Sequence, residues 1–237
     1  MIDKENIKGI IFDYGGTIDS NGLHWAEVIR RAYTDNQVFL NPDKFLDAYV
    51  HGERTLGKNR IITPEHTFRD MMRHKIAIQM KWLQENSCIT RNNDELSSAI
   101  ADDCYDFACR TIAEARPLLE ALAQKYPLAL VSNFYGNLNA VLKDFGLDGI
   151  FNAVVESAVV GVRKPDPQIF SVGAEALHLP TENVVVVGDS YDKDIVPATQ
   201  VGCQTVWLRK IGWNEYRGDE TADAIIGDFS EIGGLLL

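Results

Sequence analysis

The chain has 237 residues, 46 % of them hydrophobic and 24 % charged, a composition typical of a globular protein with one large domain or a core and a smaller companion. Its formal net charge of −11 argues against nucleic acid and against an anionic membrane surface as partners, and it favours metal cations and small ligands. The sequence has no apolar run of about 18 residues and starts with the polar stretch MIDKENIKG, so we expect a cytoplasmic protein. It carries no indication of an oligomeric state.

The predicted elements begin with a short buried strand. Residues 7–12 form an apolar run that ends at Asp13 and is soon followed by two glycines, which is how a strand of a parallel sheet meets its loop. From Trp25 onward the apolar residues recur with the period of a helix, and this pattern continues to Phe107 without a good strand. We therefore expect a helical block over residues 21–107.

The second half of the chain alternates strand-like runs with helical stretches. Four short apolar runs are predicted to be strands: YPLALVSN, GIFNAVVES, NVVVVGDS and CQTVWL. This alternation is typical of the α/β class and predicts a Rossmann-like core with a doubly wound parallel sheet. Residues 1–20 and 108–237 then form the core, and residues 21–107 form an inserted α-helical domain.

Polar side chains stand at the carboxyl ends of the predicted strands, the edge at which such sheets bind ligands. These residues are Asp13, Ser132, Asn133, Asp189 and, just behind it, Asp194, with Lys164 added from the stretch VRKPDP. Carboxylates that meet in a partly buried cleft are costly unless a cation or a proton offsets their charge. Oxygen ligands from Asp13, Asp189 and a loop carbonyl are typical of Mg²⁺, which is therefore the expected cofactor.

Four motifs that follow one another along the chain resemble those of the haloacid dehalogenase superfamily. They are IIFDYGGT, LVSN, RKPDP and VVVVGDSYDKD, and together they span nearly the whole sequence. The long helical insertion after the first motif resembles the group with a small helical cap, which includes phosphoglycolate phosphatase, β-phosphoglucomutase, phosphonatase and 2-haloacid dehalogenase. The resemblance implies a Mg²⁺-dependent phosphomonoester hydrolase that acts on a small phosphorylated metabolite.

The resemblance also implies roles for the nucleophile and the metal ligands. Asp13 would attack phosphorus and become an aspartyl phosphate. Mg²⁺ would be held by Asp13, Asp189 and the backbone carbonyl of Gly15, with Asp194 steadying the site from behind.

The phosphate group would meet a second set of residues. Lys164 would supply a fixed positive charge and Ser132 a hydroxyl donor, and the backbone amides of Gly15, Gly16 and Asn133 would complete the cradle. The helical cap, hinged near residues 19–21 and again near residue 108, would close over the substrate.

Gly15 departs from the pattern of the family. Phosphatase members usually carry a second aspartate two residues after the nucleophile, as general acid and base, and this chain has Gly15 there. Dehalogenases usually carry a tyrosine at that position, and phosphonatases an alanine together with a cap lysine that forms a Schiff base. Lys58 is the candidate for such a lysine, although the lysine of RKPDP is the form usual in phosphatases. A phosphate-binding protein that has lost turnover is a further alternative.

His24 is the candidate we predict to replace the missing acid and base, because an imidazole titrates near neutrality and relatives such as β-phosphoglucomutase carry a histidine there. The alternative is a packing histidine beside Trp25. We also expect that Gly15 holds a positive φ, in which case an aspartate there would be strained.

The stretch HGERTLGKNR, residues 51–60, is predicted to be a loop that faces an anionic substrate, because it combines charges with two glycines. A solvated surface loop is the alternative.

Overall fold

The computed structural model describes residues 2–90, 93–210, 218 and 221–237. A parallel sheet of six strands in the order β3-β2-β1-β4-β5-β6 lies at its centre. The strands are β1 (Gly9–Phe12), β2 (Leu128–Ser132), β3 (Ala153–Glu156), β4 (Val184–Gly188), β5 (Gln204–Leu208) and β6 (Ala224–Ile226). The strand order reverses direction next to β1, as in doubly wound folds. The predicted α/β class with a doubly wound parallel sheet is confirmed, and β6 was not predicted.

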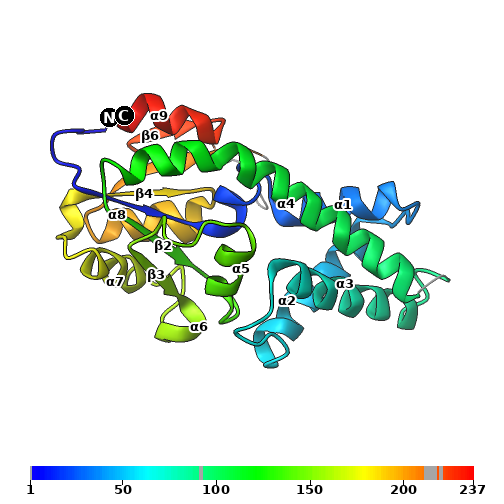
Figure 1. Cartoon of the computed structure of the whole chain (residues 1–237). Coiled ribbons are helices and arrows are strands. Elements are labelled where there is room, and N and C mark those ends of the chain that lie inside the picture. The colour runs from blue at the N-terminus through cyan, green and yellow to red at the C-terminus, as the bar shows by residue number, and fades with distance from the viewer. Residues whose placement is uncertain (1, 91–92, 211–217, 219–220) are drawn as a thin grey trace.

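Helices cover both faces of the sheet (Figure 1). On one face, Ile11 and Val186 pack against α7 (Gln168–Ala176) and α8 (Val196–Gln200). On the other face, neighbouring residues of the same strands pack against the second half of α4 (Asp94–Ala123) and against α5 (Leu138–Asp144) and α9 (Ile232–Leu236). A short helix, α6 (Ser157–Val160), follows β3. Burial on both faces explains why β1, β2 and β4 are apolar without alternation.

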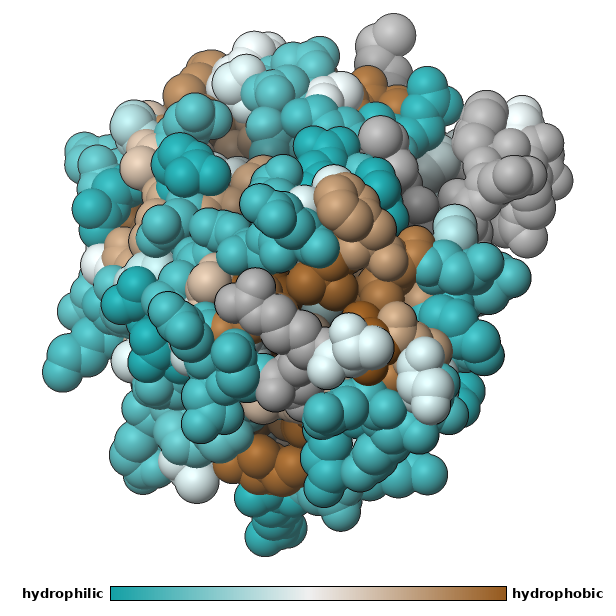
Figure 2. Space-filling model, turned by 90° about the vertical axis from the view of Figure 1, so that its right-hand side faces the viewer, coloured by the Kyte–Doolittle hydropathy of each residue, from teal (hydrophilic) through white to brown (hydrophobic). Residues whose placement is uncertain are grey.

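Four helices form the other end of the molecule (Figure 1). They are α1 (Trp25–Asp35), α2 (Pro42–Lys58), α3 (Phe68–Glu85) and the first half of α4. Trp25 joins them, because its ring lies 5.3 Å from that of Phe68 and 6.2 Å from that of Phe107. The surface of this end is largely hydrophilic, with smaller hydrophobic areas between the polar side chains (Figure 2), as expected of amphipathic helices.

Helix α4 connects the two ends of the molecule without a break. It has 30 residues; Ile100 and Cys104 face the other helices, and Leu119 and Leu122 face the sheet. The hinge expected near residue 108 therefore falls inside a continuous helix. The apolar period runs on through this position, so no local signal ends the helix there.

The prediction of a loop over residues 51–60 is wrong, because residues 51–58 belong to α2. Asn41 caps this helix by accepting a hydrogen bond from the amide of Asp43, and Pro42 occupies its first turn. Gly52 lies inside the helix against Gln79 of α3, whose Cγ would be 3.0 Å from a Cβ at that position. Close packing between helices, and not a turn, accounts for this glycine.

None of the described helices combines the length and the apolar character that a membrane span requires.

Candidate active site

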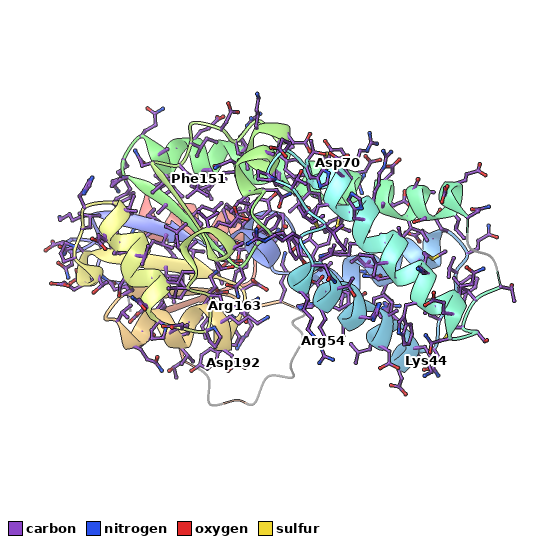
Figure 3. All side chains as sticks on the ribbon, turned by 90° about the horizontal axis from the view of Figure 1, so that it is seen from below. Lys44, Arg54, Asp70, Phe151, Arg163 and Asp192 are labelled. Carbon is purple, nitrogen blue, oxygen red and sulfur yellow. The ribbon has the colours of Figure 1, made fainter. Side chains whose placement is uncertain are left out.

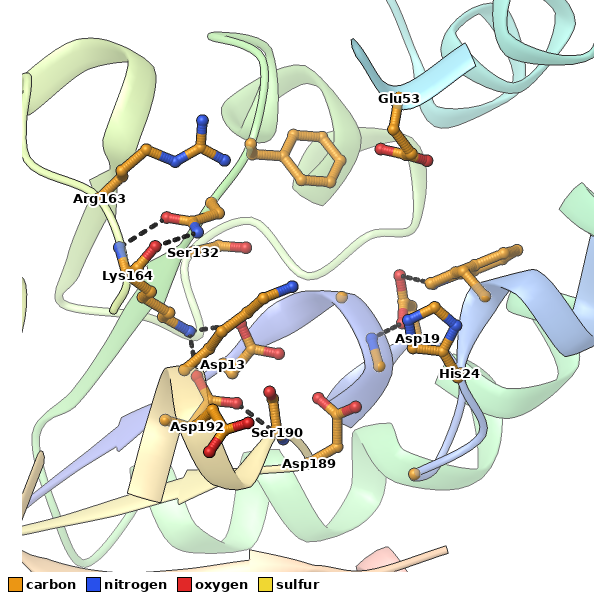
Figure 4. Close-up of a pocket in the computed structure, with 18 of the residues that line it drawn as sticks. Asp13, Asp19, His24, Glu53, Ser132, Arg163, Lys164, Asp189, Ser190 and Asp192 are labelled. Carbon is orange, nitrogen blue, oxygen red and sulfur yellow. Dashed lines mark hydrogen bonds and ion pairs between the residues drawn. The ribbon is translucent and has the colours of Figure 1, made fainter. Parts of the chain in front are cut away.

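A cleft of about 550 Å³ lies between the carboxyl ends of the strands and the helices α1–α3. Residues from both ends of the molecule line it (Figure 4). Seen from below, Arg163 and Asp192 lie on the sheet side near this junction and Arg54 on the helical side (Figure 3). The cleft brings together Asp13, Gly15, Gly16, Ser132, Asn133, Lys164, Asp189, Asp194 and His24, all of which the sequence had singled out.

The conformation of the loop after β1 requires one of its two neighbouring glycines, Gly16. Gly16 has a φ of 105°, and a Cβ on it would lie 2.5 Å from the carboxylate oxygens of Asp189. Only glycine allows both this backbone conformation and this close approach. Gly15 has a φ of −81°, so the positive φ expected there belongs to Gly16 instead.

Three carboxyl groups meet below this loop. Asp13, Asp189 and Asp194 each place an oxygen within 4.8 Å of the others, and the hydroxyl of Thr17 lies 3.0 Å from Asp13 Oδ2 and 3.2 Å from Asp189 Oδ1. Burial, with the nearby carboxylates, raises the pKa of Asp13 to about 6 and that of Asp189 well above its usual value. Hard oxygen ligands that repel one another at this distance fit a divalent cation such as Mg²⁺.

Lys164 lies between two of these carboxylates. Its Nζ is 2.6 Å from Asp13 Oδ1 and 2.7 Å from Asp194 Oδ1, and the residue is 4 % exposed. Burial alone would lower the pKa of Lys164, but Asp13 and Asp194 outweigh it and raise the pKa to about 12. Asp194 Oδ2 accepts a hydrogen bond from the amide of Ser190, so both oxygens of Asp194 are engaged. Asp194 therefore positions Lys164 as well as the loop after β4.

Ser132 and Asn133 follow β2 and differ in what they contact. Ser132 is buried at the end of the strand and lines the cleft. The side chain of Asn133 forms two hydrogen bonds with the backbone of Lys164: Oδ1 accepts from its amide at 2.9 Å, and Nδ2 donates to its carbonyl at 3.0 Å. Asn133 therefore aligns the loop that carries Lys164.

Asp19 is a buried carboxyl group at this site that sequence reasoning did not select. Its Oδ1 accepts a hydrogen bond of 2.8 Å from the amide of Gly16, so that amide, which was expected in the phosphate cradle, is already engaged. Its Oδ2 accepts a hydrogen bond of 2.9 Å from Trp25 Nε1. Burial outweighs these bonds and raises the pKa of Asp19 to about 7. The only signal in the sequence is its position on the loop after β1, four residues after Gly15.

His24 lines the cleft next to Asp19 (Figure 4). It is the N-cap residue of α1, where its Nδ1 accepts a hydrogen bond of 3.1 Å from the amide of Ala26. Burial, with a smaller contribution from Lys193, lowers the pKa of His24 to about 4. The imidazole is therefore neutral near pH 7, with its Nε2 carrying the proton.

The helical wall of the cleft carries a charged cluster that the sequence did not reveal. Lys75 Nζ of α3 lies 2.6 Å from Glu53 Oε1 of α2, and the hydroxyl of Tyr135 donates to Glu53 Oε2 at 2.6 Å. Burial would raise the pKa of Glu53, but Lys75 and Tyr135 offset this and lower it. Lys58 is exposed at the last turn of α2 and is not among the described residues that line the cleft.

Comparisons with known proteins agree with this architecture. Residues 7–202 match the model of the haloacid dehalogenase-like hydrolases. A glyceraldehyde 3-phosphate phosphatase of Pyrococcus furiosus is 34 % identical over 232 residues, which cover 95 % of this chain and 91 % of the relative. A phosphoserine phosphatase of Thermus thermophilus is 32 % identical over 116 residues, 48 % of this chain and 46 % of the relative.

Solved structures share the fold at low sequence identity. A crystal structure of a dehalogenase with an intermediate complex is similar with a TM-score of 0.66 and 17 % identity, covering 100 % of this chain and 99 % of that one. The Bacillus subtilis protein YfnB, described as a HAD-hydrolase bound to magnesium, has a TM-score of 0.60 and 19 % identity, covering 97 % of this chain and 98 % of that one. The chain belongs to the haloacid dehalogenase-like hydrolases.

Proposed function

We propose that this hydrolase is a Mg²⁺-dependent phosphatase that cleaves a small phosphorylated metabolite through an aspartyl phosphate. One observation carries the proposal: the buried carboxylate of Asp13, at the end of β1, lies 2.6 Å from Lys164 Nζ and shares the hydroxyl of Thr17 with Asp189. A carboxylate nucleophile needs such a cationic and hydrogen-bonded setting to approach a phosphate dianion. The relatives named as phosphatases support the same reaction class.

The residues at the end of the sheet have distinct roles in this reaction. Asp13 attacks phosphorus. Lys164 holds the transferring phosphoryl group by charge, and Ser132 offers it a hydroxyl donor from the end of β2. Asn133 and Asp194 keep Lys164 in place through the contacts described above. Lys164 and Ser132 stabilise negative charge on the phosphoryl oxygens, which is present in the substrate and grows in the transition state.

Asp13, Asp189 and the carbonyl of Gly15 are the ligands we propose for Mg²⁺, with Asp194 behind them. When bound, the cation supplies positive charge that polarises the phosphoryl oxygens. The three carboxyl groups, whose oxygens lie within 4.8 Å of one another, support this ligand set. The hydroxyl of Thr17 contacts both carboxyl groups, at 3.0 Å from Asp13 Oδ2 and 3.2 Å from Asp189 Oδ1.

We propose that residues 21–107 act as a cap on a core formed by residues 1–20 and 108–237. The cleft has the volume of a small-metabolite site, and α1, α2 and α3 all contribute to its lining. In this arrangement the leaving group faces Glu53, Lys75 and Tyr135, which are polar and line the cleft. Specificity for the leaving group is assigned to these three side chains.

The test is phosphate release from a broad panel of phosphorylated metabolites, with and without Mg²⁺. Turnover of at least one phosphomonoester that requires Mg²⁺ and is lost in Asp13→Asn is the expected result. Binding of orthophosphate and Mg²⁺ with no turnover across the panel would instead identify a phosphate-binding protein. Borohydride trapping with phosphonoacetaldehyde tests the phosphonatase alternative, for which the exposed position of Lys58 gives no support.

A further inference from the structure

Gly15 leaves the position two residues after Asp13 without a side chain that can exchange protons. This inference rests on the proposed function: an alkyl leaving oxygen needs a proton, and the water that hydrolyses the aspartyl phosphate must give one up. Among the described residues, a Cβ built on Gly15 would have one neighbour within 4 Å, Oδ2 of Asp19 at 3.9 Å. A carboxyl oxygen thus already lies beside the point where a side chain at residue 15 would begin.

Asp19 is held in this place by two neutral donors. The amide of Gly16 bonds Oδ1 and the indole of Trp25 bonds Oδ2, and Asp19 lines the cleft although it is 1 % exposed. Two buried lysines of the cleft pair with other carboxylates instead: Lys164 with Asp13 and Asp194, and Lys75 with Glu53. A buried carboxyl group whose hydrogen-bond partners are all neutral is able to hold a proton that an ion-paired carboxylate cannot.

We propose that Asp19 is the general acid and base of this active site, in place of a carboxyl group at residue 15. In the first step an oxygen of Asp13 bonds to phosphorus, the bond from phosphorus to the leaving oxygen breaks with its electron pair on that oxygen, and the Asp19 proton moves there. In the second step the Asp19 carboxylate takes a proton from a water molecule as the water oxygen bonds to phosphorus. The bond from phosphorus to Asp13 then breaks, and orthophosphate leaves.

His24, the candidate from the sequence, is less well placed for this role. Its Nδ1 is occupied as the cap of α1, and its Nε2 carries the proton of a neutral imidazole, which is a weak acid. The carboxyl group of Asp19 lies on the same loop as the nucleophile, so its position relative to Asp13 is fixed by that loop and by Trp25.

The test compares leaving groups that differ in their need for a proton. Glycerol 2-phosphate releases a basic alkoxide, whereas 4-nitrophenyl phosphate releases a stable phenolate without protonation. Asp19→Asn is expected to lower kcat/KM for glycerol 2-phosphate by about 10²–10⁴-fold and to change kcat/KM for the aryl ester by less than about tenfold. Because hydrolysis of the aspartyl phosphate also needs the base, the aryl ester should show a burst of nitrophenolate followed by slow turnover.

Two further variants separate proton transfer from structure. Gly15→Asp added to Asp19→Asn should restore at least tenfold of the lost kcat/KM for glycerol 2-phosphate, because the backbone at Gly15 accepts a side chain. Trp25→Phe removes one of the two hydrogen bonds that fix the same carboxyl group, so it should lower kcat/KM for glycerol 2-phosphate more than that for the aryl ester, but less than Asp19→Asn does. A variant that retains the wild-type kcat/KM for 4-nitrophenyl phosphate is thereby shown to be folded.

Three outcomes would overturn the proposal. Equal losses on both esters without rescue by Gly15→Asp would make Asp19 structural. A loss selective for glycerol 2-phosphate in His24→Ala, with none in Asp19→Asn, would move the role to His24. If the wild-type protein cleaves neither ester nor any metabolite of the panel, the proposed function itself is wrong. If the wild-type protein does cleave the aryl ester, the phosphatase function stands, and the variants then test the role of Asp19 alone.

Discussion

The two walls of the cleft are built in different ways. On the sheet side, Asp13, Asn133 and Asp189 directly follow β1, β2 and β4, so the place of each along the chain determines its place in the site. On the helical side, Glu53, Lys75 and Tyr135 come from α2, α3 and the loop after β2, and they meet only because these segments pack together. Under the proposed function, the sheet side carries the groups that act on the phosphate, and the helical side carries the groups that select the substrate.

Asp13 gives the strongest test of the proposed separation between catalytic residues on the sheet side and substrate-selecting residues on the helical side. Asp13→Asn removes the nucleophile and keeps the shape of the side chain, so turnover of every phosphoester should fall to the background rate. Phosphate release and a thermal melt measure activity and folding together. Asp192→Asn is the matched control, because it changes an exposed carboxyl group of the same cleft and should leave most activity. Near wild-type turnover in Asp13→Asn would contradict the assignment of Asp13 as the nucleophile and of the sheet side as the catalytic wall.

Asp189→Asn tests the metal site on the same wall. Replacing one anionic ligand with a neutral amide should raise the Mg²⁺ concentration needed for half-maximal activity by about tenfold or more. Titration calorimetry with Mg²⁺ alone gives a second measurement that needs no turnover. An unchanged titration would place the cation elsewhere.

The two neighbouring glycines offer a sharper test of the loop geometry. Gly16→Ala forces a side chain into a positive φ and against Asp189, so it should lower the free energy of unfolding by at least about 1–2 kcal/mol. Gly15→Ala meets no such contact and no positive φ, so it should change stability by less than about 1 kcal/mol. Chemical denaturation of both variants is the measurement, and similar losses in the two would contradict the conformation described for this loop.

The helical wall should respond differently and more weakly. Lys75→Met removes the ion pair with Glu53, so kcat/KM for the metabolite substrate should fall by about tenfold while that for 4-nitrophenyl phosphate stays nearly constant. Glu53→Gln, which keeps an acceptor for the hydroxyl of Tyr135, should restore part of this loss in the double variant because it removes the unpaired charge. Equal losses on both substrates would assign Lys75 to the chemistry and end the distinction between the two walls.

Local signals were enough for the sheet side because a parallel sheet brings the carboxyl ends of its strands to one edge. Once the strands were predicted, the meeting of Asp13, Ser132 and Asp189 followed from topology. The same signals failed for residues 51–58, whose glycines indicated a loop although Gly52 serves the contact of α2 with α3. They also missed β6, which has three residues at the edge of the sheet and is too short for a hydrophobic period to identify.

By itself, the sequence determined the α/β class, the order of the first five strands along the chain and the candidate groups at their ends, because these depend on hydrophobic period and on short motifs. Only the tertiary structure decided which of the two glycines the loop conformation requires, how Glu53 meets Lys75, and where the carboxyl group of Asp19 lies. Each of these depends on the approach of segments through side-chain packing and hydrogen bonds. A carboxyl group six residues after the nucleophile has no fixed direction until Trp25 and Gly16 hold it.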